Sequence, residues 1–274
     1  MLAEFVMSTD AFLSMFGARE EHEPRDPMKA AQGGMRNVLP KRFYAAVSVE
    51  LRQGLWHLLL DGKVARTPAR QPLAVDNEAI AAAIADEWQA QDSQISPATM
   101  PLTRLVNAAI DGVRDADVPV REEIVRYAGS DLICYRAETP RELAERQCAI
   151  WDPLLAWTRE ALGADLNPAN GIIHVTQPPQ ALTRIAEAVA AIAAPVPLAA
   201  LSAATTISGS AVIALALAHG RLDADAAWQA SSVDEDYQAS VWGTDDEAVF
   251  RQANRRRDFG AAALALASSR TRAR

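Results

Sequence analysis

The chain has 274 residues, of which 50% are hydrophobic and 23% are charged, and its formal net charge is -8. This composition is that of a folded globular protein with room for one large domain or two small ones, and it excludes a disordered chain. The acidic balance argues against nucleic acid as the main ligand, because phosphate binding needs a basic surface. The two cysteines, Cys134 and Cys148, have no CxxC spacing and are expected to be reduced, packed thiols.

Residues 1–39 have a mixed composition that includes the acid-rich stretch REEHEPRDP. We interpret them as a mobile N-terminal extension. The first residues carry Glu4 and Asp10 and lack a basic leader, which is typical of neither a secretory signal nor an Arg-rich transit peptide.

The segment that follows has the pattern of strands. Apolar residues alternate with polar or small ones from Phe43 to Leu51, which is the period of a half-buried strand. The next segment, GLWHLLLDGKVARTP, is divided by Asp61 and Gly62, a strong hairpin signal. QPLAV adds a candidate fourth strand. The sequence therefore predicts a small antiparallel sheet.

The rest of the chain has helical periodicity. Asn77 is placed to cap a helix that carries Ile80, Ile84 and Trp88 on one stripe, and further amphipathic helices follow from about residue 101. The predicted fold class is therefore α+β, with a small antiparallel β-rich N-terminal module followed by a mainly α-helical C-terminal domain. The predicted domains are residues 40–112, with one or two helices beside the sheet, and residues 113–270.

An uncharged run from Ala188 to Ala218 resembles a membrane span at first sight. However, prolines interrupt it, and its strongly apolar part, AVIALALA, is far shorter than the roughly 20 residues that a span needs. We predict a buried central helix and no membrane insertion. Ser208, Gly209 and Ser210 are expected to lie inside this helix, where their small size allows close packing.

Aromatic and acidic residues share one stripe of the helix predicted from Asp223 to about Val241. Trp228, Ser232, Glu235, Ala239 and Trp242 recur at spacings of 4, 3, 4 and 3. Burying an unpaired carboxylate is costly, so a structural Glu235 needs a cationic partner from a neighbouring helix. Alternatively the stripe meets another protein, since aromatic residues are enriched at interface cores. The spacing leaves both interpretations open.

Local signatures of catalysis or cofactor binding are absent from the sequence. GxSxG, GxxxxGK[ST] and GxGxxG do not occur, and the four histidines form neither HxxxH nor HExxH. We therefore expect no cofactor and no metal. The basic run from Arg255 to Arg257 is expected to lie mostly on the solvated face of a helix and not to bind nucleic acid.

Taken in order, several segments resemble one known family. They are KRFY, LLLDGKVARTPARQPL, IADEWQAQDSQISPATMPLTRLVNAAID, YAGSDLICYRAETP, QCAIWDPLLAW, GIIHVTQP and DEDYQASVWG. Together they cover about residues 40–265 and look like the assembly chaperone of the F-type ATP synthase catalytic head that handles its alpha subunit. The resemblance implies that the protein is not an enzyme. It implies a chaperone that binds the unassembled alpha subunit and prevents its aggregation until it pairs with the beta subunit, without ATP hydrolysis.

The resemblance also suggests roles for individual residues. Glu235 occupies the acidic position of the family's E-x-Y-Q segment, which the resemblance marks as functionally sensitive. We therefore expect a partner-binding surface made by Glu235 with Trp228, Tyr237, Gln238 and Trp242. Family members occur in mitochondria and in some bacteria. The acidic extension makes the bacterial cytoplasm the expected location, or the mitochondrial matrix if the source is eukaryotic.

The stretch EWQAQDSQISPATMPLT is expected to join the two parts of the fold. Trp88 occupies the family's tryptophan in EWxxQ and is expected to matter mainly for folding. Trp88, Gln91 and Pro101 are expected to build a structural seam between the sheet module and the helical domain. The alternative function is an enzyme whose active site is assembled from distant carboxylates and amides at this seam. A deep polar cleft favours that alternative, whereas a broad, shallow apolar patch favours the chaperone.

Overall fold

The structure is a computed structural model and describes residues 39–272 of the chain. A small antiparallel sheet comes first in the sequence and a mainly helical part follows, so the predicted α+β fold class is confirmed. The predicted mobile extension, residues 1–39, lies outside the described residues except for Leu39.

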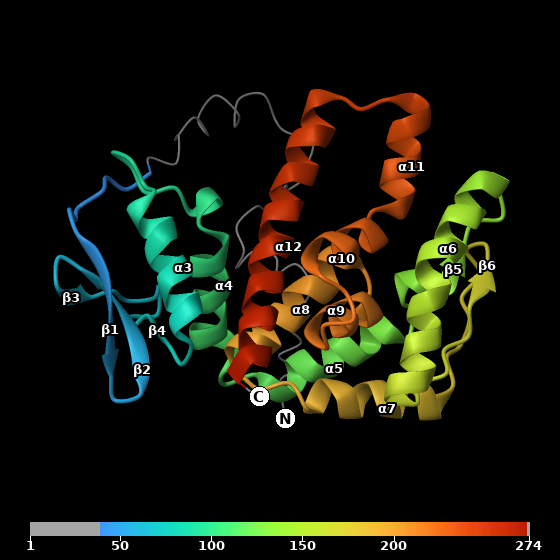
Figure 1. The fold of residues 1–274 in the computed structure, drawn as a ribbon, viewed down its shortest axis with the longest axis horizontal. Helices are drawn as coiled ribbons and strands as arrows, with labels where there is room; N and C mark the ends of the chain where they lie inside the picture. Colours follow the sequence, from blue (N-terminus) through green and yellow to red (C-terminus); the bar gives the residue numbers. More distant parts are fainter. Residues whose placement is uncertain (1–38, 273–274) are drawn as a thin grey trace, which may run out of the picture.

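The helices and strands follow one another as β1 (Val47–Arg52), β2 (Leu55–Leu60), β3 (Lys63–Val64), β4 (Ala74–Val75), α3 (Glu78–Gln89), α4 (Pro101–Ala108), α5 (Asp117–Ala128), β5 (Tyr135–Arg136), α6 (Arg141–Trp157), β6 (Ala169–Asn170), α7 (Pro179–Ala190), α8 (Val196–Ser208), α9 (Ala211–Ala218), α10 (Ala224–Ser231), α11 (Val233–Trp242) and α12 (Asp246–Arg272). The first sheet lies at one end of the molecule and α6, with the short parallel pair β5–β6, at the other (Figure 1). The long helix α12 lies between these two ends.

The sheet is built around β2, which pairs antiparallel with β1, β3 and β4. The predicted hairpin turns at Asp61 and Gly62, both of which have positive φ, and QPLAV contributes the predicted fourth strand as β4. The first strand begins at Val47, later than predicted, because the carboxylate of Asp61 accepts the backbone N–H groups of Ala45 and Ala46. Before this point Tyr44, and not Phe43, turns into the core.

Helix α3 packs against the sheet by its apolar stripe. Its N-terminus is capped as predicted: the side-chain oxygen of Asn77 accepts the N–H of Ile80 at 3.2 Å. Ile80 and Ile84 are buried, and the ring of Trp88 lies against that of Tyr44 with centroids 5.5 Å apart. The Tyr44 hydroxyl donates to the backbone oxygen of Trp88 at 2.7 Å. Trp88 thus connects the end of α3 to the segment that leads into the sheet.

The turn after α3 is held by one buried amide. The Gln91 side chain donates to the backbone oxygen of Glu87 at 3.0 Å and to the hydroxyl of Thr99 at 3.1 Å. Its oxygen accepts the backbone N–H of Ser96 at 2.7 Å. Because these partners lie in the last turn of α3 and in the segment that follows it, Gln91 fixes the path of the chain from α3 to α4.

Glu87 caps the next helix from outside that helix. Its carboxylate accepts the backbone N–H groups of Leu102 and Thr103 and the Thr103 hydroxyl, each at 2.7 Å. These donors belong to the first turn of α4, which begins at Pro101 and has no cap of its own. Burial raises the pKa of Glu87, while the three hydrogen bonds oppose that shift.

Helix α4 is tied in turn to α12. Arg104 pairs with Asp258 of α12 at 2.5 Å, and burial raises the pKa of Asp258. At the other end of α12, the Asn77 side chain donates to the backbone oxygen of Ser268 at 3.0 Å. The apolar cluster of the described residues is correspondingly continuous from Tyr44 to Leu266. The domain boundary proposed between residues 112 and 113 stays a prediction.

The uncharged run forms two buried helices, α8 and α9, and not one. Gly209 adopts a left-handed conformation with φ +72° and ends α8, so the prediction that Ser208, Gly209 and Ser210 lie inside one helix is wrong: Ser208 is the last residue of α8, and Gly209 and Ser210 lie outside it. Ser210 instead caps α9, its hydroxyl accepting the N–H of Ile213 at 3.0 Å. None of the helices within residues 39–272 is long and apolar enough to cross a membrane.

A fully buried carboxylate, that of Asp131, holds the start of α9. It accepts the backbone N–H of Val212 at 3.1 Å and that of Ile133 at 3.2 Å. Burial outweighs these hydrogen bonds and raises the pKa of Asp131 to about 6. Cys134 follows in the same turn, where burial raises its pKa to about 12; this thiol and that of Cys148 are both free.

We predict that Trp88→Arg unfolds the protein more than it affects binding. The substitution puts an unpaired charge against the apolar cluster, which costs several kcal/mol, a large share of ordinary stability. Thermal melting measures the loss. Trp88→Phe is the matched control, because the indole N–H has no hydrogen-bond partner among the described residues and the ring contact with Tyr44 is kept. An unchanged melting temperature in Trp88→Arg, combined with lost partner binding, contradicts the prediction.

We predict that Asp131 lowers stability as the pH rises from about 4 to about 6. Its pKa is about 6 in the folded protein and 3.8 as its usual value, so between these pH values the folded state keeps a proton that the unfolded chain has lost, and the free energy of unfolding falls as the pH rises through this window. The loss is about 3 kcal/mol. Asp131→Asn removes this titration. Urea unfolding of both proteins across this range should show a difference that changes with pH, and parallel curves contradict the prediction.

Candidate functional site

The helix predicted from Asp223 to about Val241 is broken in two. Helix α10 ends at Ser231 and α11 begins at Val233, with Ser232 between them in a non-helical conformation. Both serines hydrogen-bond locally: Ser231 donates to the backbone oxygen of Trp228 at 2.7 Å, and Ser232 to the Asp236 carboxylate at 2.9 Å. The Ser231 bond to a backbone oxygen competes with the helical pattern, which favours the break after this residue. The predicted continuous stripe therefore does not form.

Two of the expected partner-binding residues are buried. Trp228 is 7% exposed and packs against Phe259 of α12, with ring centroids 5.7 Å apart. Tyr237 is 8% exposed, and the guanidinium of Arg146 lies over its ring at 5.2 Å. Trp228 and Tyr237 are thus core residues in this structure, because the break at Ser232 turns α10 and α11 so that both place an aromatic side chain inside.

The other three expected residues lie on the surface of α11. Glu235 and Gln238 are exposed, with 49% of the Glu235 side chain accessible, and Trp242 is 76% exposed. Trp242 ends α11 and is followed at once by the turn into α12. Glu235, Gln238 and Trp242 are therefore available to a partner in a way that Trp228 and Tyr237 are not.

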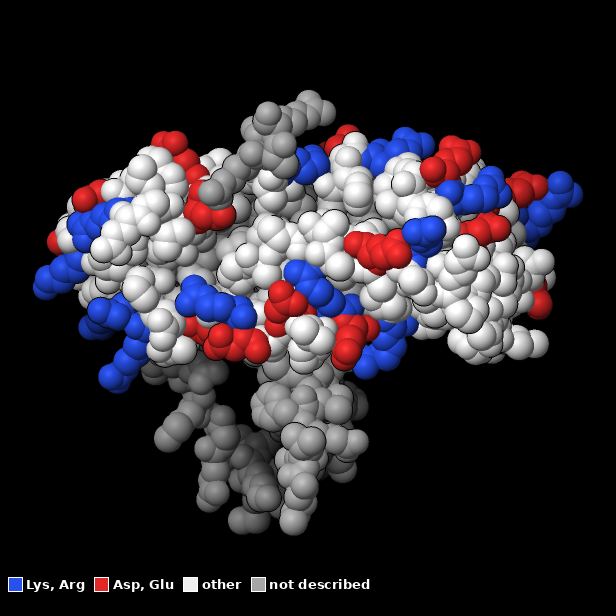
Figure 2. Space-filling model, turned by 90° about the horizontal axis from the view of Figure 1, so that it is seen from below, with Lys and Arg blue, Asp and Glu red and all other residues white. Residues whose placement is uncertain are grey.

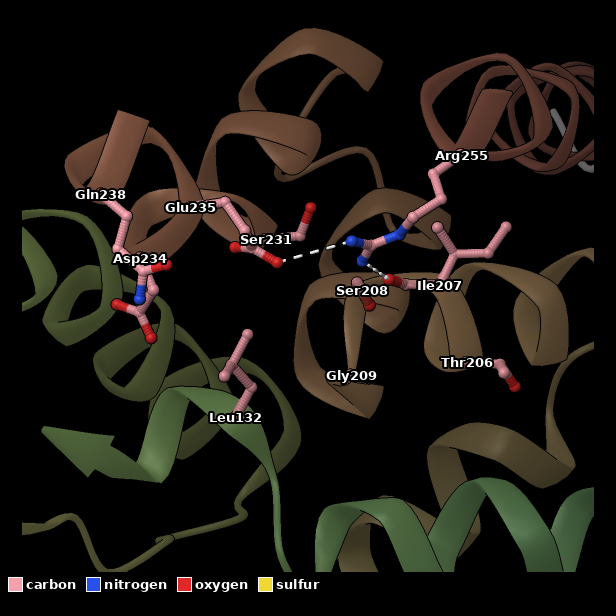
Figure 3. A pocket seen from close by; sticks show the side chains of 10 residues that line it. All are labelled: Leu132, Thr206, Ile207, Ser208, Gly209, Ser231, Asp234, Glu235, Gln238 and Arg255. Atoms are coloured by element: carbon pink, nitrogen blue, oxygen red, sulfur yellow. Dashed lines mark hydrogen bonds and ion pairs between the residues drawn. The ribbon is translucent and has the colours of Figure 1, made fainter. Parts of the chain in front are cut away.

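Glu235 and Gln238 line a groove between α11, α12 and the carboxyl end of α8. The groove has a volume of 420 Å³. Its lining, drawn in Figure 3, consists of Leu132, Thr206, Ile207, Ser208, Gly209, Ser231, Asp234, Glu235, Gln238 and Arg255. Asp131 lies next to Leu132, whose N–H donates to the Gly209 oxygen at 3.2 Å, so the same turn that caps α9 also forms one wall of the groove.

One arginine spans the groove. Arg255 of α12 donates to the backbone oxygen of Ile207 at 2.8 Å and lies 3.4 Å from the Glu235 carboxylate (Figure 3). Sequence patterning placed this residue on a solvated face, and 48% of its side chain is indeed accessible. What the pattern does not show is that its head group reaches the end of another helix.

Exposed apolar side chains flank the turn from α11 into α12, the two helices that also line the groove. Four large apolar side chains within ten residues are half exposed or more; we call this set the apolar elbow, and its members are Val241, Trp242, Val249 and Phe250. Exposed acids, among them Asp245 and Glu247, accompany them. The elbow lies at the top of the molecule in Figure 1, far from the sheet.

The seam, in contrast, uses its polar groups for structure. The carboxylate of Glu87 is occupied by the first turn of α4, and Asp258 is paired with Arg104. The Gln91 side-chain amide makes three hydrogen bonds that hold the turn after α3. Among the described residues, no group of three or more His, Cys, Asp or Glu side chains is arranged to hold a metal ion. The polar side chains of Glu87, Gln91 and Asp258 thus position the helices around the seam.

The chain is similar to known proteins in both sequence and fold. The family model described as ATP12 chaperone protein matches residues 41–159. The crystal structure of the Atu1473 protein of Agrobacterium tumefaciens is 43% identical, with a TM-score of 0.80 over 90% of this chain and 92% of that one. That of Atp12 from Paracoccus denitrificans is 39% identical, with a TM-score of 0.77 over 84% of this chain and 98% of that one.

A curated relative extends the similarity to a fungus. The mitochondrial protein atp12 of Schizosaccharomyces pombe is 25% identical over 220 residues, which cover 76% of this chain and 75% of the relative. The two crystal structures cover 90% and 84% of this chain, whereas the family model ends within the helical part. The chain therefore belongs to the ATP12 chaperone family, the ATP synthase assembly chaperones that its motifs resemble.

Proposed function

We propose that this protein binds the unassembled alpha subunit of the F-type ATP synthase catalytic head and keeps it from aggregating until it pairs with the beta subunit. The observation that carries the proposal is the apolar elbow beside an acidic groove, in a chain of the ATP12 chaperone family. A subunit awaiting its neighbour exposes apolar surface, which is an aggregation liability. A chaperone for it needs a complementary apolar surface with a polar rim, as other protein interfaces have.

The proposed mechanism needs no nucleotide. The beta subunit displaces the chaperone from the alpha subunit, because it buries more of the same surface. Competition of this kind requires only moderate affinity. The sequence lacks a phosphate-cradling loop, in keeping with a binding protein and not an ATPase. The enzyme alternative finds little support at the seam, where the carboxylates and amides hold backbone groups.

Charge supports a protein partner. Figure 2 shows acidic and basic side chains interspersed on the face seen from below, without a continuous basic tract on that face. With a net charge of -8, we propose that nucleic acid is not a ligand. For the compartment we propose the bacterial cytoplasm, since the two bacterial structures are more similar in sequence than the fungal mitochondrial relative.

We predict that the protein suppresses aggregation of the isolated alpha subunit without nucleotide. Light scattering of the refolding alpha subunit should fall at an equimolar amount of this protein, and ATP should not change the result. Suppression should be lost when Trp242 and Phe250 are both replaced by Asp, because apolar contact area is removed and covering the new carboxylates with an apolar client is costly. Val118→Asp on α5 is the matched control, since Val118 is 63% exposed but lies away from the elbow. No suppression by the unaltered protein, or a strict need for ATP, contradicts the proposal.

We predict that Glu235 contributes to binding and not to stability. Glu235→Gln should change the free energy of unfolding by no more than about 0.5 kcal/mol, as for ordinary surface substitutions. Capture of the alpha subunit should weaken, and Glu235→Lys should weaken it further, most clearly at low salt. Glu187→Lys is the control, because Glu187 also pairs with an arginine on an exposed helix, α7, away from the groove. Normal capture by a folded Glu235→Lys protein removes Glu235 from the interface.

A further inference from the structure

We infer that the groove between α8 and α11 is a binding site for an arginine side chain of the client, and that Arg255 occupies this site while the protein is free. The inference rests on the proposed function for the identity of the client. The inference goes beyond the proposed function because it names the group that the groove recognises, and because it assigns to Arg255 the role of occupying the site until the client binds.

The walls of the groove favour a cation. Two carboxylates line the α11 side: that of Glu235, and that of Asp234, which also accepts the Gln147 side-chain amide at 2.6 Å. The opposite side is the carboxyl end of α8, where backbone oxygens carry the negative end of the helix dipole and where the last turn contains no basic residue. Against these, Arg255 is the single cationic residue of the lining. Without Arg255, the charged side chains that line the groove are therefore all acidic, and the electrostatic potential there is negative.

Arg255 shows which cation fits. One of its terminal nitrogens faces Glu235 at 3.4 Å, and the other donates to the backbone oxygen of Ile207 at 2.8 Å. The two acceptors come from different helices and lie on two sides of one planar group (Figure 3). A guanidinium presents several donors in a fixed fork and meets both at once, whereas the ammonium of lysine is a point charge. The site therefore prefers arginine to lysine.

Arg255 itself is held weakly enough to be exchanged. Its side chain and that of Glu235 are each about half exposed, at 48% and 49%, and their separation is longer than that of the other arginine–carboxylate pairs of the described residues. Exposed ion pairs contribute little to stability. The volume of 420 Å³ is within the range of ligand-binding pockets, so the groove has room beyond the guanidinium already there.

Exchange also leaves no group buried without a partner. The client guanidinium takes over the Ile207 oxygen and the Glu235 carboxylate, while Arg255, on the exposed surface of α12, swings into water. The apolar elbow continues from the groove along α11 to Trp242. A client segment with an arginine followed by apolar side chains thus matches both parts of the surface.

The site is tested directly with a small probe, N-acetyl-arginine amide, titrated into the ¹⁵N-labelled protein while the amide signals of Gly209 and Ser231 are followed by NMR. These signals should shift in the unaltered protein. In Arg255→Ala the probe should bind up to about fivefold more tightly, the most that release of an exposed ion pair allows. N-acetyl-lysine amide should bind more weakly than the arginine probe, and Glu235→Lys should abolish binding.

Arg251→Ala is the matched control, because Arg251 pairs with Glu247 on the same helix outside the groove and its loss should leave the titration unchanged. Arg255→Met, which keeps the apolar part of the side chain, replaces Arg255→Ala if the latter has a lowered unfolding midpoint. The inference is overturned if Arg255→Ala binds the probe no more tightly than Arg251→Ala, or if arginine and lysine probes bind equally. Capture of the alpha subunit is measured separately, so failure of the proposed client leaves the probe result intact.

Discussion

The placement of α4 against α3 depends on one carboxylate, that of Glu87. It is the cap of a helix that begins fourteen residues later, and its two oxygens take three donors from Leu102 and Thr103. A helix start carries unsatisfied N–H groups, and here the partner is supplied from the preceding helix and not from the chain beside it. The angle between α3 and α4 is thereby set by hydrogen bonds as well as by apolar packing. Since α4 then pairs with α12 through Arg104 and Asp258, the same carboxylate acts on the far part of the fold.

Local sequence signals predicted the parts of the fold that depend on neighbouring residues. The hairpin at Asp61 and Gly62 and the cap at Asn77 were predictable because the turn or the cap is made within a few residues. The role of Glu87 was not, because its partners are set by the path of the turn that Gln91 holds. Asp131 escaped notice for the same reason: its partner at Val212 lies 81 residues away.

The candidate site shows where periodicity alone misleads. A spacing of 4, 3, 4 and 3 describes one stripe only if the helix is continuous, and two serines ended it at Ser232. Trp228 and Tyr237 then became core residues, while Glu235, Gln238 and Trp242 stayed outside. Serine is tolerated within helices and also favours their ends, so the sequence alone does not choose between the two outcomes. The prediction of one continuous helix through the small residues around Gly209 was wrong for the same reason, because α8 ends there.

Helix α12 contributes residues to the elbow, the groove and the seam, so its length and phase relate all three. Its 27 residues span about 40 Å. Along it lie Phe250 of the elbow, which is exposed, Arg255 of the groove, which reaches the end of α8, and Asp258, which pairs with Arg104 of α4. Each residue added or removed in this helix turns everything beyond it by about 100°. Insertions and deletions between these positions would therefore put the elbow, the groove and the seam out of phase together. The link from Gly243 to Asp245 lies outside α11 and α12, so a change of length there leaves the phase within α12 intact, whereas within α12 surface chemistry changes more readily by substitution.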